Sequence, residues 1–241
     1  MAIDFDGSND SAIVSTEPLG GGTFTNFFCS IWVKRDADTG LRNIIEFFDS
    51  SNPLFEYIIL FQNGPTLSLR AVSGGAAHTV SVGSFSANAW HCVQIGADKA
   101  NVSGPNRIAL RFDTTGAFTD GEPADWPTNM DSIRLGVAFG SLTPGYFNGA
   151  LAELHLSRFS LRDRYPGEDK QPDTLMERYT PLHILPQAAY WAGVAANAGY
   201  WPMRNVNELA DEINGYPISY PGVNPATNRG EHPKIITAAA A

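Results

Sequence analysis

The 241-residue sequence lacks any long apolar run. A helix that crosses a membrane needs about 20 consecutive apolar residues, and no stretch comes near that length. The first ten residues, MAIDFDGSND, carry neither the basic region nor the apolar stretch of an export signal. We therefore expect no membrane contact and no signal peptide.

Basic residues are scarce as well. The chain has 16 Lys and Arg against 25 Asp and Glu, which gives a formal net charge of −9 at pH 7. A chain of this charge repels the phosphates of nucleic acids and of anionic lipids. The composition therefore predicts no nucleic-acid partner.

Cysteine is limited to Cys29 and Cys92. Each lies inside a strand-like apolar run, where a free cysteine packs as a small hydrophobic residue. We expect two buried thiols. The alternative is a disulfide, which would require the two strands to be adjacent and in register.

Turn-forming residues, in contrast, are abundant, with 23 Gly and 16 Pro. From Ala2 to about Ser157, β-rich runs alternate with Gly, Asn, Asp or Pro, and no helix-length apolar period appears. The expected strands are 2–6, 11–16, 23–35, 41–48, 55–62, 66–72, 78–83, 89–98, 106–113, 130–140 and 146–158. This pattern predicts an all-β fold, an antiparallel two-sheet sandwich or jelly roll.

Three dipeptides supply the positive φ that tight hairpin turns require. They are Asn63-Gly64, Gly74-Gly75 and Asn148-Gly149. The run FFCSIWV at 27–33 is apolar on both faces, with Phe28 and Trp32 on the second. It predicts a central strand that is covered on both sides; a partly exposed aromatic face and a ligand groove are the alternatives.

The amino-acid composition changes after Ser157. Residues 161–241 are rich in Pro and aromatics, and we expect a mostly irregular extension with short helices at 172–182 and 206–213. Such a segment cannot bury enough of its own surface to fold alone. It must pack either on its own sandwich or on a neighbouring subunit.

Four motifs in order resemble the laminin-G-like branch of the concanavalin A-like lectin and glucanase jelly rolls. The motifs are IDFDGSNDSAIV, FCSIWVKRD, NAWHCVQIGAD and GYFNGALAELHLSRFSL. The resemblance covers about residues 2–160 and implies a jelly-roll domain over 1–160, followed by the extension over 161–241. It also implies that the first and last strands of the jelly roll pair near the middle of a sheet. The segment YWPMRNVNELADEING resembles one that usually precedes such a jelly roll, whereas here it follows.

Catalytic residues are not evident in the sequence. Glycoside hydrolysis needs two carboxylates about 5 to 9 Å apart, and the glucanase relatives carry a Glu-x-Asp-x-x-Glu run that this chain lacks. Glu46 and Glu153 are the candidates for a divergent hydrolase, the least favoured function. We expect no enzymatic activity.

The sequence does not predict a resident cofactor. Asp4, Asp6, Asn9 and Asp10 could offer oxygen ligands to calcium, although their spacing is not that of an EF-hand loop. The favoured alternative is that these acids cap a turn. The five histidines are scattered without zinc-ligand spacing.

Aromatic residues outside the strands are candidates for contact with glycans or partners. They are Trp126, Tyr146, Trp191, Tyr200 and Trp201. The alternative, which we favour, is that such rings anchor the extension to a protein surface.

Domains of the resembled kind occur without signal peptides among phage particle proteins. The resemblance therefore implies a non-catalytic virion protein, made in the host cytoplasm, that decorates the capsid or sits on the tail or a fibre, with a capacity for glycan adhesion. The implied partners are further copies in a homo-oligomer, with a trimer expected, other virion proteins such as the major capsid protein, and cell-surface glycans. A free lectin-type carbohydrate-binding module is the alternative.

Overall fold

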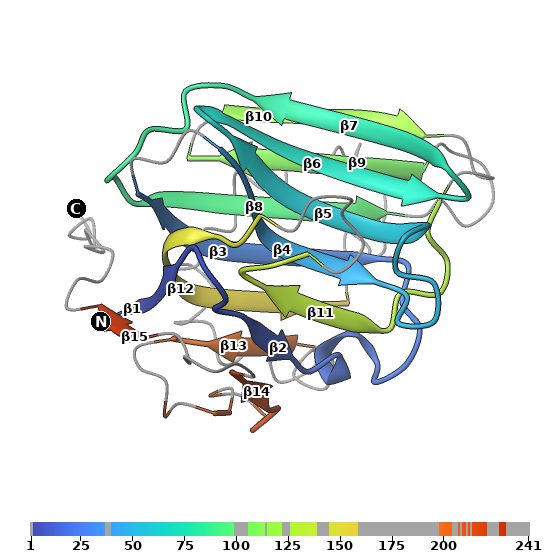
Figure 1. Cartoon of the computed structure of the whole chain (residues 1–241). Helices are drawn as coiled ribbons and strands as arrows, with labels where there is room; N and C mark the ends of the chain where they lie inside the picture. The colour runs from blue at the N-terminus through green and yellow to red at the C-terminus, as the bar shows by residue number, and fades with distance from the viewer. Residues whose placement is uncertain are drawn as a thin grey trace, which may run out of the picture.

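The computed structural model describes residues 2–36, 40–98, 106–113, 115–121, 126–138, 145–158, 198–203, 207, 209–210, 212, 214–220 and 227–229. Within these residues the chain forms two antiparallel sheets that lie face to face (Figure 1). The elements are β1 (Ala2–Asp6), β2 (Ala12–Val14), η1 (Glu17–Leu19), β3 (Phe27–Arg35), β4 (Leu41–Phe48), β5 (Glu56–Asn63), β6 (Thr66–Ser73), β7 (Ala76–Val82), β8 (His91–Asp98), β9 (Asn106–Phe112), β10 (Thr115–Gly121), β11 (Ser132–Leu135), β12 (Asn148–Ser157), β13 (Ala198–Trp201), β14 (Ile218–Ser219) and β15 (Thr227–Arg229).

Sheet A has the strand order β10-β9-β8-β3-β12-β1-β15, with β13 also paired to β12. Sheet B has the order β14-β2-β11-β4-β5-β6-β7. Strand β1 pairs with β12, the last strand of the predicted jelly roll. The fold class predicted from the sequence, an all-β jelly-roll sandwich, is confirmed.

The main core fills the space between the two sheets. Phe27 of sheet A stacks on Phe47 of sheet B, with ring centroids 3.9 Å apart, and Phe24 packs edge-on against both rings. Alternation along each strand places these side chains inward, because successive residues of a strand point to opposite faces.

Strand β3 is buried on both faces, as its sequence predicted. It lies between β8 and β12. On its outer face Phe28 is 5% exposed, and Trp32 packs against a small cluster of alanines.

Both cysteines are free thiols, as expected. Cys29 lies in the main core, whereas Cys92 lies near Ser30, with its sulfur 3.9 Å from the Ser30 Oγ. Burial raises the pKa of Cys29, and it raises the pKa of Cys92 to about 12. Both side chains are therefore neutral and unreactive at physiological pH.

Two of the three predicted turns need correction. Asn148 and Gly149 form no hairpin turn, because they lie inside β12, paired with Asp6 and Phe5. A Cβ atom at Gly149 would lie 2.2 Å from a backbone oxygen of β3, so the glycine allows close strand approach. The turn after β5 is shifted by one residue, to Gly64-Pro65, with φ +56° at Gly64. The third turn is at Gly74-Gly75, as predicted.

The described parts of the extension pair with this chain's own sandwich. β13 pairs with β12 and β15 with β1 in sheet A, while β14 pairs with β2 at the edge of sheet B. The helix predicted at 172–182 lies outside the described residues. Between 206 and 213, the residues that are described form turns and a bridge, in which Ala210 pairs with Pro217.

Candidate functional site

The outer face of sheet B carries a second apolar cluster, separate from the main core. It consists of Phe48, Tyr57, Ile59, Val72 and Ala138, with Phe61 packed against them. The cluster arises because β5 is apolar at every position from 57 to 61: Ile58 and Leu60 point into the core, so the alternate residues point outward.

A shallow hollow opens beside this cluster, over β4, β5 and β6, the strands at the front of Figure 1. Its volume is about 60 Å³. It is lined by Leu41, Asn43, Tyr57, Ile59, Phe61 and Arg70. The lining combines aromatic rings, aliphatic side chains, one amide and one guanidinium, which is the mixture expected of a small-molecule site.

A β-bulge places Asn43 in the hollow. The register between β4 and β5 shifts between Asn43 and Ile45, so Ile44 and Ile45 both enter the core. The backbone N–H of Asn43 donates to the carbonyl oxygen of Gly145 at 2.9 Å. A Cβ atom at Gly145 would lie 2.2 Å from the carbonyl oxygen of Leu41, so this close approach requires glycine.

Each polar side chain in the hollow, Asn43, Tyr57 and Arg70, can donate a hydrogen bond. Arg70 is exposed on β6. Asn43 is 1% exposed, and its Nδ2 has no hydrogen-bond partner among the described residues. Burial raises the pKa of Tyr57, an effect that Arg70 opposes and Glu46 strengthens, so the phenol keeps its proton at neutral pH.

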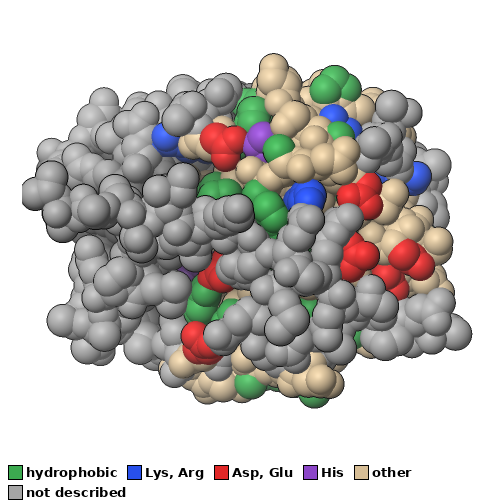
Figure 2. Space-filling model, turned by 90° about the vertical axis from the view of Figure 1, so that its left-hand side faces the viewer, with side chains coloured by type: hydrophobic (Ala, Val, Ile, Leu, Met, Phe, Trp, Pro, Cys, Tyr) green, Lys and Arg blue, Asp and Glu red, His purple; other side chains and the backbone are tan. Residues whose placement is uncertain are grey.

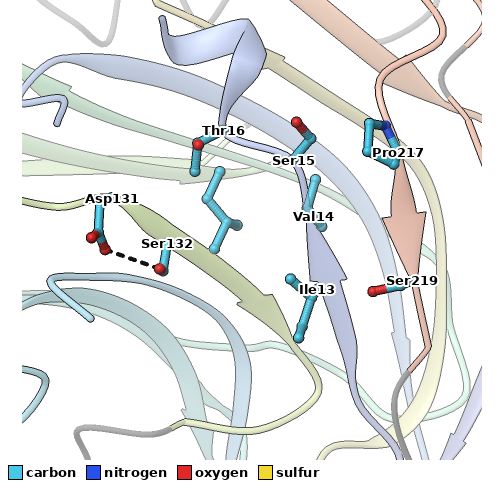
Figure 3. Close-up of a pocket in the computed structure, with 9 residues that line it drawn as sticks. Ile13, Val14, Ser15, Thr16, Asp131, Ser132, Pro217 and Ser219 are labelled. Atoms are coloured by element: carbon cyan, nitrogen blue, oxygen red, sulfur yellow. Dashed lines mark hydrogen bonds between the residues drawn. The ribbon is translucent and has the colours of Figure 1, made fainter. Parts of the chain in front are cut away.

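A second, larger hollow of about 300 Å³ lies toward the opposite edge of sheet B, at β2, β11 and β14 (Figure 3). It is lined by Ile13, Val14, Ser15, Thr16, Asp131, Ser132, Ile133, Pro217 and Ser219, so β14 of the extension helps to build it. Asp131 already accepts hydrogen bonds from Ser50 and Ser132. Burial alone would raise the pKa of Asp131, but these hydrogen bonds lower it. None of the described residues that line it has an aromatic or basic side chain.

The predicted contact residues lie elsewhere, and the buried ones fit the favoured alternative, in which such rings anchor chain segments to the protein. Trp126 and Trp201 are 1% exposed and Tyr200 is 4% exposed, so these rings are buried in the fold and cannot meet a glycan from solution. Trp201 instead anchors the extension, with its Nε1 donating to the carbonyl oxygen of Tyr216 at 3.0 Å. Tyr146 is half-buried and follows Gly145, next to the hollow. Trp191 lies outside the described residues.

The candidate calcium ligands at the end of β1 make turn contacts. Asp10 accepts a hydrogen bond from the backbone N–H of Asp6 at 2.9 Å, and Asp6 accepts one from Ser8 at 2.8 Å. Asp4 lies within β1 and Asn9 in the turn. Burial raises the pKa of Asp10. In the described part of the chain no group of three His, Cys, Asp or Glu side chains could hold a metal ion.

Ser86, His91 and Asp113 form a hydrogen-bonded chain in the order of a hydrolase triad. Ser86 Oγ lies 2.8 Å from His91 Nε2, and His91 Nδ1 lies 2.6 Å from Asp113 Oδ2. A triad aspartate is buried, whereas the Asp113 side chain is 42% exposed. Asp113 also accepts the backbone N–H of Cys92 and donates its own N–H to the Cys92 carbonyl. We interpret these contacts as structural: they join the segment after β7, the start of β8 and the turn after β9.

The two hydrolase candidates are separated by the fold. Glu46 lies on β4 of sheet B and is 0% exposed, and Glu153 lies on β12 of sheet A and is 5% exposed. Two inaccessible carboxylates in different sheets do not form a pair that flanks one glycosidic bond.

Of the helices that the structure describes, none is long and apolar enough to span a membrane.

Similar proteins are found by structure alone. No protein-family model and no curated protein matches the chain. The fold is similar to the CBM40 module of Ruminococcus gnavus IT-sialidase, in a structure bound to α2,3-sialyllactose: the TM-score is 0.52 at 16% identity, over 68% of this chain and 91% of that one. For domains LG4-5 of the mouse laminin α1 chain the TM-score is 0.49 at 18% identity, over 65% and 40% of the two chains.

A more distant similarity is to tailspike protein 2 of Escherichia coli O157:H7 bacteriophage CAB120, with a TM-score of 0.42 at 12% identity, over 66% of this chain and 26% of that one. The similarity to the CBM40 module, whose TM-score is above 0.5, shows that the chain has the jelly-roll fold of that module.

Proposed function

We propose that this chain is a non-catalytic glycan-binding protein of lectin type and that the hollow over β4, β5 and β6 is its sugar site. Sugars bind where an aromatic ring can lie against the ring C–H groups and polar groups can reach the hydroxyls beside it. The observation that carries the proposal is the half-buried Phe61 ring beside Asn43 and Arg70 in one hollow. The fold shared with a module whose structure holds sialyllactose supports it.

The larger hollow of Figure 3 fits a glycan less well. Its hydroxyl groups suit sugar contacts, but its described lining residues include no aromatic ring on which a sugar could stack. Its carboxylate, Asp131, already holds Ser50 and Ser132. We therefore place the proposed site at the smaller hollow.

A glycan array followed by calorimetry tests the proposal. The Phe61→Ala variant should lose at least about tenfold in affinity, or about 1.4 kcal/mol. Phe55→Ala is the matched control, because Phe55 is 50% exposed and lies outside the hollow. A folded wild-type protein that binds no glycan, or a Phe61→Ala variant that binds as tightly as wild type, would overturn the proposal.

For the biological setting we propose a phage particle, with this protein as a decoration of the capsid or a component of the tail. Its partners would be other virion proteins, such as the major capsid protein, and further copies in a homo-oligomer such as a trimer. The four-motif resemblance over residues 2–160 supports this setting. Mass spectrometry of purified particles tests it, and the absence of this chain from them would refute it.

A further inference from the structure

We infer that the hollow selects acidic glycans and holds the carboxylate of a terminal sugar through Arg70. This inference rests on the proposed function and adds the chemical class of the ligand. A carboxylate only accepts hydrogen bonds, whereas a sugar hydroxyl both donates and accepts them. A hollow in which a guanidinium and a buried amide N–H group without a described partner offer hydrogen bonds therefore favours the carboxylate.

The polar groups of the hollow match that requirement. Arg70 presents a guanidinium, which is permanently charged and forms paired hydrogen bonds to carboxylates. Tyr57 contributes a phenol that remains protonated at neutral pH. Asn43 contributes Nδ2, a buried donor without a partner among the described residues. An unpaired buried donor costs about 1 to 3 kcal/mol, and a ligand oxygen would remove that cost.

The surroundings of Arg70 leave its charge available to a ligand. Its cross-strand neighbours are Ile59 on β5 and Thr79 on β7, both uncharged. Glu46 lies on β4, on the far side of β5 from Arg70. Its cross-strand neighbours are Ile59 on β5 and Arg134 on β11. Glu46 therefore lies next to Arg134, across Ile59 from Arg70.

The hollow is large enough for one substituent of a sugar, such as a carboxylate, but not for the sugar ring. Its volume of about 60 Å³ is well below the roughly 150 Å³ of a cavity that encloses a benzene ring. A carboxylate can enter, while the sugar ring stays outside, against Phe61. The inferred pose thus has the acid group pointing into the sheet and the rest of the glycan over its surface.

The net negative charge of the molecule opposes the binding of acidic glycans. The positive charge of Arg70 in the hollow is therefore needed to offset it. The formal net charge is −9, and Figure 2 shows acidic side chains at several places on the described surface at one end of the sandwich. A molecule with this field repels anionic ligands at long range. Binding of an acidic glycan therefore depends on a positive group in the site, and Arg70 is the basic residue among the described residues of the lining.

The test compares acids with their esters. The probes are 3′-sialyllactose and a glucuronic acid-terminated disaccharide, each beside its methyl ester, which keeps the sugar and removes the charge. Wild-type protein should bind at least one acid at least tenfold more tightly than its ester. Arg70→Gln should abolish that difference, whereas Arg111→Gln, which removes the same charge from β9 in sheet A, should retain it.

The outcomes separate the inference from the proposed function. Equal binding of acid and ester, or an Arg70→Gln variant that keeps the preference, would overturn the inference. If neutral glycans still bound and lost affinity in Phe61→Ala, the glycan-binding function would stand without acid selection. If no glycan of any charge bound the folded protein, both would fail.

Discussion

The backbone N–H of Glu153 donates a hydrogen bond to the carbonyl oxygen of Pro202, with 3.1 Å between the two atoms. Glu153 has φ +54° at a bulge in β12. Before the bulge β12 pairs with β1, and after it with β13, while β3 pairs along its other edge. The bulge thus makes room for the extension in sheet A, and the described extension is an integral part of the sandwich.

Removing the aromatic anchor of the extension should destabilise the whole domain. Trp201→Ala removes a ring that is 1% exposed together with its hydrogen bond to Tyr216. Buried Trp→Ala changes cost about 3 to 5 kcal/mol. Urea denaturation measures the loss. Leu209→Ala is the control, because Leu209 is 53% exposed and should change the free energy of unfolding by less than about 0.5 kcal/mol. If both variants changed the free energy of unfolding by the same small amount, the extension would not be an integral part of the sandwich.

A side chain at Gly149 should separate β12 from β3. The added Cβ of Gly149→Ala would meet the Lys34 carbonyl oxygen at 2.2 Å, and the φ of +150° disfavours alanine. Overpacking of this kind costs about 1 to 3 kcal/mol. Thermal unfolding of Gly149→Ala beside Gly22→Ala tests it, since a Cβ at Gly22 meets nothing within 4 Å. A Gly149→Ala variant as stable as Gly22→Ala would show that the strands do not approach this closely.

The two thiols should resist alkylation in the folded protein. Burial raises the pKa of Cys29, and that of Cys92 to about 12, so iodoacetamide at pH 8 should label neither until urea is added. The pKa values of the two thiols are higher in the folded than in the unfolded protein. Protonation of the thiols therefore stabilises the folded state. Stability should therefore be fully present below about pH 9 and fall as the pH rises toward 12. Rapid labelling of the native protein at pH 8 would contradict this burial.

The contacts of His91 should matter for stability and not for catalysis. His91→Gln breaks the links to Ser86 and Asp113, and the loss should be about 1 to 3 kcal/mol. Ser86→Ala breaks only one link and should cost less. A fluorophosphonate probe should leave Ser86 of the native protein unmodified, which mass spectrometry can determine. Labelling at Ser86 that disappears in His91→Gln would instead indicate acyl-transfer chemistry.

Local patterns in the sequence predict most of the strands. The run 41–48 is predicted with the bounds that β4 has in the structure, because β-branched and aromatic residues dominate it. Strand β10 is missed because its sequence, TGAFTDG, is typical of a turn. It is held in the sheet by pairing with β9 along its whole length, which local propensity does not reveal.

The candidate site could be predicted only in part. The run YIILF at 57–61 is apolar at every position, a signal of a second covered face that was available in the sequence. The meeting of Asn43 with Arg70 depends on the bulge in β4 and on the registers of three strands. Those registers are set by long-range packing. The sequence favoured an anchoring role for the aromatic residues of the extension, but the surface on which Tyr200 and Trp201 are buried depends on strand pairing that local patterns do not reveal.

The most direct test of the proposed site is a map of amide chemical-shift changes as the protein is titrated with the tightest-binding glycan of the array. The account predicts that the largest changes cluster at 41–43, 57–61 and 70, around the hollow over β4, β5 and β6. Changes centred on 13–16, 131–133 and 217–219, at the hollow of Figure 3, would contradict it and move the sugar site to the edge that the extension completes.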